Sequence, residues 1–227
     1  MMKNGIKFAT IALGTVLLVG GCANKEMKAQ HSGFLSDYSE LHEDEKYQGT
    51  ASWIAPDADF KKYDSFIVTP VQINDNLEEK DKTPERLALL KKVSEYLTEG
   101  YKQAIEKNSG FKQAETAGPK TLKLETFISA VAVQHDDLKL YQFIPVALVV
   151  TEVKRATVDH GSVRILGEAR ITDSQTNKVL LRGMSLRKGQ EIKTEKDQLT
   201  FEELKPALDS WLKDAERRLQ KLKANQR

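Results

Sequence analysis

The sequence predicts an α+β domain, in which a mostly antiparallel sheet of about four to five strands is covered by two long amphipathic helices and one short helix. Two observations predict this class. Stretches in which apolar and polar residues alternate occur as neighbouring pairs, as they do in antiparallel hairpins. Other stretches place apolar residues three and four positions apart, which is typical of helices that bury one face. The expected order is strand, long helix, two strands, short helix, hairpin and long helix.

The first two elements of the domain are a strand and a long helix. Residues 65–73 favour a strand, and Pro70 within them cannot donate to a ladder, so this strand should lie at an edge or contain a bulge. Thr83 supplies a hydroxyl cap, and Pro84 suits the first helical position. Apolar residues then recur at helical spacing, which predicts a helix as far as about Lys107.

The middle of the domain predicts two paired strands and a short helix. Residues 111–115 and 121–133 flank a turn segment at 116–120. One face of the second strand is expected to carry Leu122, Leu124, Thr126, Ile128, Ala130 and Ala132. Residues 143–153 form a short apolar run that Pro145 interrupts, so we expect a short helix packed on the sheet.

A strand pair and a long helix complete the domain. Residues 163–172 and 178–187 alternate clearly, and they are joined by a polar turn in which Asn177 can adopt a left-handed backbone. Thr200 and Glu203 form a capping box that predicts the start of the last helix. One face of this helix is expected to carry Leu204, Leu208, Trp211, Leu212, Ala215, Leu219 and Leu222.

Composition excludes several classes of function. The chain has 227 residues, of which 40% are hydrophobic and 30% charged, and this favours one globular domain over a fibrous or disordered chain. Its net charge of +2 gives no basic excess that would point to nucleic acid. The single Cys excludes an internal disulfide and any zinc site with two or more thiolates. Composition does not identify a substrate.

The first 21 residues predict a secretory signal peptide. Lys3 and Lys7 form its basic region, and the uncharged, largely apolar residues 8–21 follow. As a helix this stretch would span about 21 Å, short of the roughly 30 Å hydrocarbon core, so a permanent transmembrane anchor is the weaker interpretation. Residues 18–22, Leu-Val-Gly-Gly-Cys, resemble the lipobox of bacterial lipoproteins.

The lipobox resemblance implies lipidation of Cys22. A diacylglyceryl group would be transferred to its sulfur, the chain would be cleaved before it, and the new amine would usually be acylated, with palmitate as the expected chain. Two or more acyl chains anchor a protein stably. Ala23 and Asn24 follow instead of the Asp that retains lipoproteins in the inner membrane, so we expect the periplasmic face of the outer membrane. The alternative is an ordinary buried Cys in an N-terminal helix.

These predictions divide the chain into residues 1–21 as a signal peptide, 22–50 as a lipidated tether and 51–227 as a single α+β periplasmic domain. The tether is polar for most of its length, but it contains large side chains that a plain linker would not need: Phe34, Leu35, Tyr38 and Leu41. They either dock at helical spacing on the domain's own core or form a partner-binding motif.

The mature chain resembles a known family. Five features occur in order: Cys22, the stretch 32–41 that begins Ser-Gly-Phe-Leu, Tyr63, the stretch 173–180 (Asp-Ser-Gln-Thr-Asn-Lys-Val-Leu) and Trp211. In this order they resemble a lipoprotein family of Gram-negative bacteria that is defined only as a domain of unknown function. Asn177 stands where the family usually has Gly, which affects the turn and no chemistry. The resemblance implies an outer-membrane-type lipoprotein and no particular activity.

No catalytic pattern stands out. The sequence lacks Gly-x-Ser-x-Gly, phosphate-loop and dinucleotide motifs. His135 beside two aspartates and His160 after Asp159 could each supply a base, but both positions are expected in solvated segments. His42 and the acidic run after it lack the spacing of a calcium loop. We therefore expect no metal and no cofactor.

The leading function hypothesis is a non-enzymatic, lipid-anchored lipoprotein that acts as a scaffold or accessory subunit for an envelope complex, with no nucleic-acid partner. An alternative is a lipid- or glycan-binding module, which would hold an apolar cavity between the sheet and the helices. A second alternative is a hydrolase that uses His135 or His160. The last helix ends in basic residues that either complement its dipole or contact anionic lipid or glycan: Arg217, Arg218, Lys221, Lys223 and Arg227.

Overall fold

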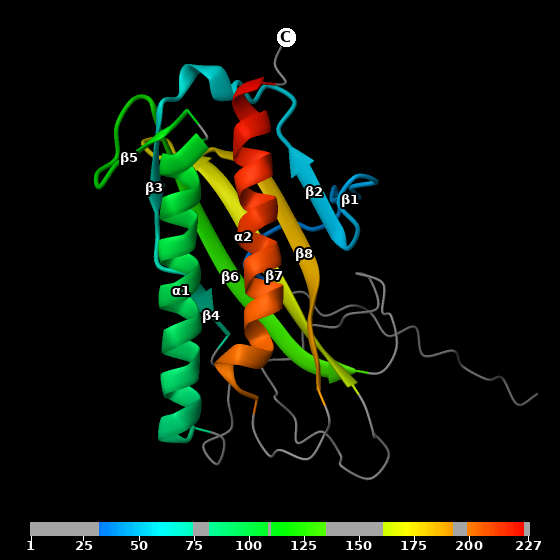
Figure 1. Ribbon diagram of the computed structural model, residues 1–227. Coiled ribbons are helices and arrows are strands. Elements are labelled where there is room, and N and C mark those ends of the chain that lie inside the picture. Colours follow the sequence, from blue (N-terminus) through cyan, green and yellow to red (C-terminus); the bar gives the residue numbers. More distant parts are fainter. Residues whose placement is uncertain (1–31, 75–81, 109, 135–160, 193–198, 225–227) are drawn as a thin grey trace, which may run out of the picture.

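The computed structural model describes residues 32–74, 82–108, 110–134, 161–192 and 199–224, which Figure 1 shows. The strands are β1 (His42–Glu43), β2 (Thr50–Ile54), β3 (Ser65–Val68), β4 (Gln72–Ile73), β5 (Lys112–Gln113), β6 (Thr121–Gln134), β7 (Gly161–Asp173) and β8 (Val179–Ile192). The helices are α1 (Pro84–Asn108), α2 (Phe201–Ala224) and the short 3₁₀ helix η1 (Phe60–Lys62). Within these ranges, no helix has the length and apolar character needed to cross a membrane.

The predicted architecture is wrong in strand number and strand direction, although the chain is α+β. Eight strands form one mixed sheet in the order β1-β2-β8-β7-β6-β3-β5, with β4 beside β6. β3 and β4 run parallel to β6, and β5 runs parallel to β3. The described residues hold two α-helices rather than three, and the segment predicted as a short helix, 143–153, lies outside them.

Short strands and long-range pairing explain these errors. β1, β4 and β5 have two residues each, too few for an alternating pattern to be visible in the sequence. Residues 111–115 and 121–133 are predicted to pair with each other, but in the sheet β3 lies between β5 and β6. β3, α1 and β6 instead form a parallel crossover, a connection that the short turn at 116–120 does not reveal.

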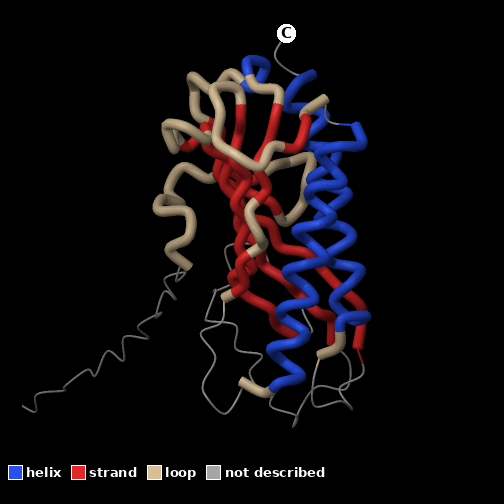
Figure 2. Tube along the Cα trace, turned by 90° about the vertical axis from the view of Figure 1, so that its left-hand side faces the viewer, coloured by secondary structure: helices blue, strands red, loops and turns tan. Residues whose placement is uncertain are grey.

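The molecule has one helical layer and one sheet. α1 and α2 lie side by side on one face of the sheet, in front of β6, β7 and β8 in Figure 1. Residues 32–41 contact the opposite face, and Figure 2 shows this segment and the helices on opposite sides of the strands. We call residues 32–41 the N-terminal strap.

The packing of α2 on the sheet depends on a glycine. A Cβ atom at Gly167 in β7 would lie 2.3 Å from ring atoms of Trp211 in α2, so only glycine leaves room for the indole. Trp211 is 6% exposed and belongs to one core cluster with Ile165 and Leu208. This contact fixes the position of α2 over β7.

A bulge in β6 changes which side chains face the helices. Leu122 belongs to a core cluster under the helices, whereas Ala130 belongs to the cluster on the strap side. The pairing with β7 shifts between Ile128 and Ala130, so the alternation reverses and Val131 faces the helices. The single face predicted from Leu122 through Ala132 is therefore wrong beyond Ile128.

Candidate ligand cavity between the helices and the sheet

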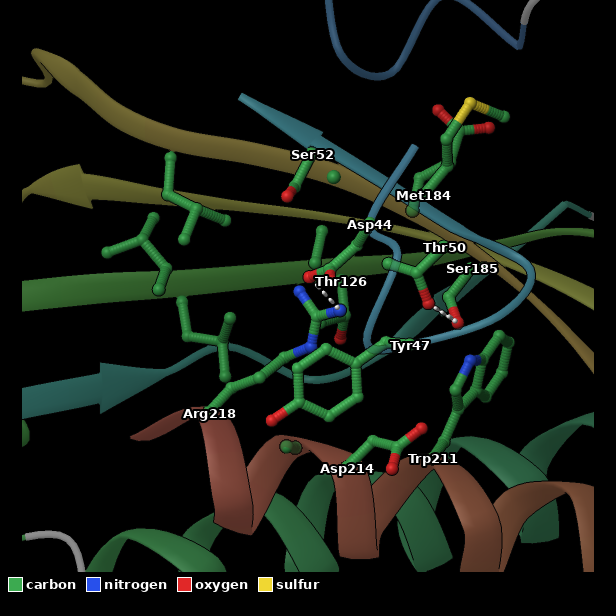
Figure 3. A pocket seen from close by; sticks show the side chains of 18 of the residues that line it. Asp44, Tyr47, Thr50, Ser52, Thr126, Met184, Ser185, Trp211, Asp214 and Arg218 are labelled. Atoms are coloured by element: carbon green, nitrogen blue, oxygen red, sulfur yellow. Dashed lines mark hydrogen bonds and ion pairs between the residues drawn. The ribbon is translucent and has the colours of Figure 1, made fainter. Parts of the chain in front are cut away.

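A cavity of about 730 Å³ lies between the helices and the sheet. Side chains from α1, α2, β2, β6, β7 and β8 line it, and its outer part reaches residues 42–47 around β1 (Figure 3). Small-molecule sites in proteins usually occupy roughly 300–1,000 Å³. The cavity therefore has the size of a ligand site.

The cavity exists because the strands carry small residues where they face α2. Ala169 in β7 and Gly183 and Ser185 in β8 line it, and Ala215 lies on α2. In a close-packed interior, larger side chains would fill this space. Gly167 also lines the cavity, but the Trp211 ring already occupies the room that its missing side chain leaves.

The inner walls of the cavity are apolar. They are formed mainly by aliphatic side chains from both helices and from β6, β7 and β8: Leu97, Leu124, Ile128, Ile171, Leu181 and Leu219. Each square ångström of apolar ligand surface that enters such a site contributes about 25 cal/mol. These walls favour an apolar portion in any ligand.

Arg187 of β8 holds a buried polar cluster at the cavity wall. Its guanidinium pairs with Asp214 of α2 and donates to the Thr50 hydroxyl at 3.0 Å and to the Gln48 carbonyl at 3.1 Å. The hydroxyls of Thr50 and Ser185 lie 3.3 Å apart (Figure 3). The side chains of Arg187 and Asp214 are 9% and 13% exposed, so water screens this pair weakly. The cluster ties β2, β8 and α2 together.

Tyr47, in the loop between β1 and β2, lines the outer part of the cavity among basic side chains of α2. Its ring centroid lies 4.3 Å from the Arg218 guanidinium and 5.0 Å from Lys221 Nζ. Lys221 donates to the Tyr47 hydroxyl at 2.8 Å, and Arg218 pairs with Asp44 at 3.3 Å. Figure 3 shows the Tyr47 ring beside Arg218 and Asp214. Burial lowers the pKa of Arg218, and the Asp44 carboxylate opposes this shift.

Tyr101 of α1 adds a hydroxyl to the cavity wall. Burial raises the pKa of this hydroxyl to about 12, although the positive charge of Arg187 opposes the shift. The phenol is therefore protonated at neutral pH and can donate a hydrogen bond. Within the described ranges, no group of three or more His, Cys, Asp or Glu residues could hold a metal ion. The cavity offers an apolar volume with hydroxyl and charged groups at one side.

Several candidate site residues predicted from the sequence lie outside the described residues: Cys22, His135, His160 and Arg227. Lipidation of Cys22 and the hydrolase alternative therefore stay predictions. His42 is described, and it lies exposed in β1 at the outer part of the cavity.

The four apolar or aromatic residues of the predicted tether contact the domain's own sheet. Leu35 is 1% exposed, and the Phe34 ring stacks on Phe127 with 5.3 Å between centroids. Tyr38 and Leu41 pack against the core cluster on the strap side. The strap forms turns and bends here, so the docking does not use helical spacing. A partner-binding role for these residues stays a prediction.

Charged side chains also hold the strap. Arg182 of β8 pairs with Asp37 and with Glu40, each at 2.9 Å. The Tyr38 hydroxyl donates to a Glu168 carboxylate oxygen at 2.6 Å. Residues 32–50, which the sequence assigns to the tether, thus contribute the strap, β1 and the loop that carries Tyr47.

An apolar cavity between the sheet and the helices was expected only for a lipid- or glycan-binding module, and the residues that line it were not predicted. Its signal was the recurrence of Gly167, Ala169, Gly183 and Ser185 on strand faces that would otherwise carry large apolar side chains. The basic residues near the end of α2 make specific contacts within the domain, since Arg217 pairs with Asp214 in addition to the contacts of Tyr47. The contacts with Tyr47 and Asp44 come from residues far away in the sequence, so the α2 sequence alone could not predict them.

Comparison with known proteins relates the chain to lipoproteins. "Uncharacterized lipoprotein YdcL" from Escherichia coli K12 is 31% identical over 214 residues, which cover 92% of this chain and 94% of that protein. The PelC dodecamer from Paraburkholderia phytofirmans is 9% identical over 77% of this chain and 97% of its own, with a TM-score of 0.40. The hypothetical protein CT253 from Chlamydia trachomatis is 8% identical over 72% and 99%, with a TM-score of 0.41.

These two structural likenesses say nothing about what the chain binds, because both the identities and the TM-scores are low. The relation to YdcL and the match to a family profile are stronger evidence of relationship than these structural likenesses. The profile of DUF3313, described as "Protein of unknown function", matches residues 30–215. The chain therefore belongs to the DUF3313 family, which confirms its resemblance to a lipoprotein family defined only as a domain of unknown function.

Proposed function

We propose that this chain is a non-enzymatic lipoprotein, anchored by lipid on Cys22 at the periplasmic face of the outer membrane, whose domain binds an apolar small molecule. The relation to YdcL supports a place in the cell envelope. The lipobox-like stretch before Cys22 supports the anchor, and Ala23 and Asn24 support the outer membrane.

The cavity is the observation that carries the binding role. Protein interiors are close-packed, and voids larger than a water molecule are few. A cavity of about 730 Å³ with aliphatic walls is therefore best explained by a ligand that occupies it. The walls favour a lipid over a glycan, because buried sugar hydroxyls would need hydrogen-bond partners that Leu, Ile and Ala side chains do not offer.

A neutral dye tests this function. We propose to titrate the full-length chain carrying Cys22→Ser, whose own acyl chains cannot enter the cavity, with N-phenyl-1-naphthylamine, which fluoresces in apolar surroundings. Ala169→Leu places a larger side chain in the cavity. We expect saturable binding by the parent chain and at least about fivefold weaker binding by Ala169→Leu, because the filled volume excludes the dye.

Ala88→Leu is the matched control, since it makes the same change on the exposed surface of α1. It should leave dye affinity unchanged, and thermal unfolding should show that both variants fold. Absence of saturable binding, or equal affinity in Ala169→Leu and Ala88→Leu, would count against a ligand-binding cavity.

A scaffold or accessory role in an envelope complex is the second proposal. It is supported by the proposed anchor and by Ile54 in β2, a large apolar side chain that is 51% exposed. Cross-linking in cells with a photoreactive residue at position 54 should then capture one recurring envelope protein. A chain that stays uncross-linked on intact membranes would contradict this role.

A further inference from the structure

We propose that the ligand of this cavity is an anionic amphiphile, whose acyl chain lies against the apolar walls and whose carboxylate or phosphate binds Lys221 beside Tyr47. This inference rests on the proposed binding function and names the chemical class of its ligand. It follows from the charges at the outer part of the cavity and from their position relative to the apolar walls.

Most basic side chains near the opening already have carboxylate partners. Arg187 and Arg217 both pair with Asp214, and Arg218 pairs with Asp44. Two guanidinium groups thus share the one carboxylate of Asp214, which cannot neutralise both of them. Cations at this opening can pair with the charged group of an anionic ligand.

Two cations that line the cavity, Lys46 and Lys221, are available for such an anion, and Lys221 is the one that contacts Tyr47. It is exposed on α2, and in the described part of the chain it forms no ion pair with a carboxylate. Its ammonium group has three donors, and the Tyr47 hydroxyl accepts one of them at 2.8 Å. The centroid of the Tyr47 ring lies 5.0 Å from Lys221 Nζ, and the ring holds the ammonium group in place. The other two donors of the ammonium group stay available.

The acidic side chains at the same opening set a limit on this recognition. Glu43 and Glu45 also line the outer part of the cavity, and both are exposed. The overall field at the opening is therefore mixed. A head group would be recognised by direct contact with Lys221 rather than by long-range attraction, so salt should weaken binding only modestly.

The apolar walls begin beside this ammonium group. Leu219 and Leu222, neighbours of Lys221 on α2, line the cavity. A molecule with one charged end and one apolar chain matches this order of groups. A neutral hydrocarbon would leave Lys221 unused, and a soluble anion would leave the walls without contact.

Competition with the bound dye tests the head group. The full-length Cys22→Ser chain, loaded with N-phenyl-1-naphthylamine, would be titrated with laurate, with dodecanol and with a twelve-carbon lysophosphatidylglycerol. Laurate and dodecanol share a chain length and differ in charge. We expect laurate to bind more tightly than dodecanol, and Lys221→Gln to weaken laurate about fivefold to tenfold without changing dodecanol.

Lys213→Gln is the control, because Lys213 is exposed on the same helix and does not line the cavity. Weakening of laurate or of the lysophospholipid by Lys221→Gln alone supports the proposal, and the better competitor of the two identifies a fatty acid or a phospholipid as the source. Equal binding of laurate and dodecanol in both variants overturns the head-group assignment and leaves cavity binding intact. No dye binding at all overturns the binding function itself.

Discussion

Gly167 and Trp211 act as one packing unit. A Cβ at position 167 would lie 2.3 Å from the Trp211 ring, well inside van der Waals contact. Gly167→Ala should lower the free energy of unfolding by about 2 kcal/mol, because the added methyl group must displace the indole from β7. Chemical denaturation followed by circular dichroism measures this change.

A double-mutant cycle separates this contact from a general effect of alanine in the strand. Trp211→Leu alone should also destabilise the domain, since it leaves a cavity beside Gly167. In the double variant the new methyl group has room. Its loss of unfolding free energy should therefore be smaller than the sum of the losses in the two single variants. Gly118→Ala, in the loop before β6, is the comparison for a glycine-to-alanine change away from Trp211; its Cβ would lie 3.1 Å from the Thr121 hydroxyl. Strict additivity would refute the packing unit.

At the scale of elements, the strap should respond to pH. The amide and hydroxyl of Ser39, followed by Arg182, hold the pKa of Asp37 at about 2, below its ordinary value of 3.8. A carboxylate whose pKa is lower in the folded state contributes stability that is present above about pH 4 and is lost as the pH falls through about 2. We therefore expect the strap to detach more readily at pH 2 than at pH 6.

Asp37→Asn makes this prediction specific. The variant should be less stable than the parent at pH 6, and the difference should shrink as the pH falls to 2, where about half of the parent's Asp37 is protonated. Glu43→Gln, at an exposed carboxylate of β1, is the comparison. Limited proteolysis within residues 32–41 measures detachment, and a difference between Asp37→Asn and the parent that persists unchanged to pH 2 would be inconsistent with this role of Asp37.

The long elements could be predicted from the sequence because they repeat their period many times. The helix expected from Pro84 to about Lys107 is α1, Pro84–Asn108. The capping box is confirmed, since a Glu203 carboxylate oxygen accepts from the Thr200 amide at 2.7 Å and α2 begins at Phe201. Asn177 has a φ of 57°, the left-handed conformation expected for its turn. Each of these features depends on residues that are close in sequence.

Features that depend on distant residues could not be predicted in this way. Pro70 divides the predicted strand 65–73 into β3 and β4, but only the sheet shows that both run parallel to β6. The cavity lies between the helices and the sheet, and the small residues of β7 and β8 reveal it only once these strands and α2 are known to face each other. Tyr47 meets Lys221 across 174 sequence positions.

At the scale of the whole molecule, the strap limits how far the domain can stand from a bilayer. Docking begins at residue 32, so of the predicted tether 22–50 only residues 22–31 precede the described part of the chain. Ten residues extend at most about 36 Å. With Cys22 in the bilayer, as proposed, the domain would stay near the membrane surface, where amphiphiles are concentrated.

The anchor itself gives the last prediction. Cys22→Ser removes the sulfur that would receive the diacylglyceryl group, so the chain should be released or mislocalised and should lack the acyl mass expected for the parent. The predicted anchor depends on this one position, because two or more acyl chains are needed to hold a protein stably. Ala29→Ser, in the same stretch but outside the lipobox-like residues, should change neither property. Cell fractionation together with intact mass measurement checks both variants. The parent chain could carry no lipid on Cys22, or it could retain residues 1–21. Either result would remove the basis for placing the cavity beside a bilayer.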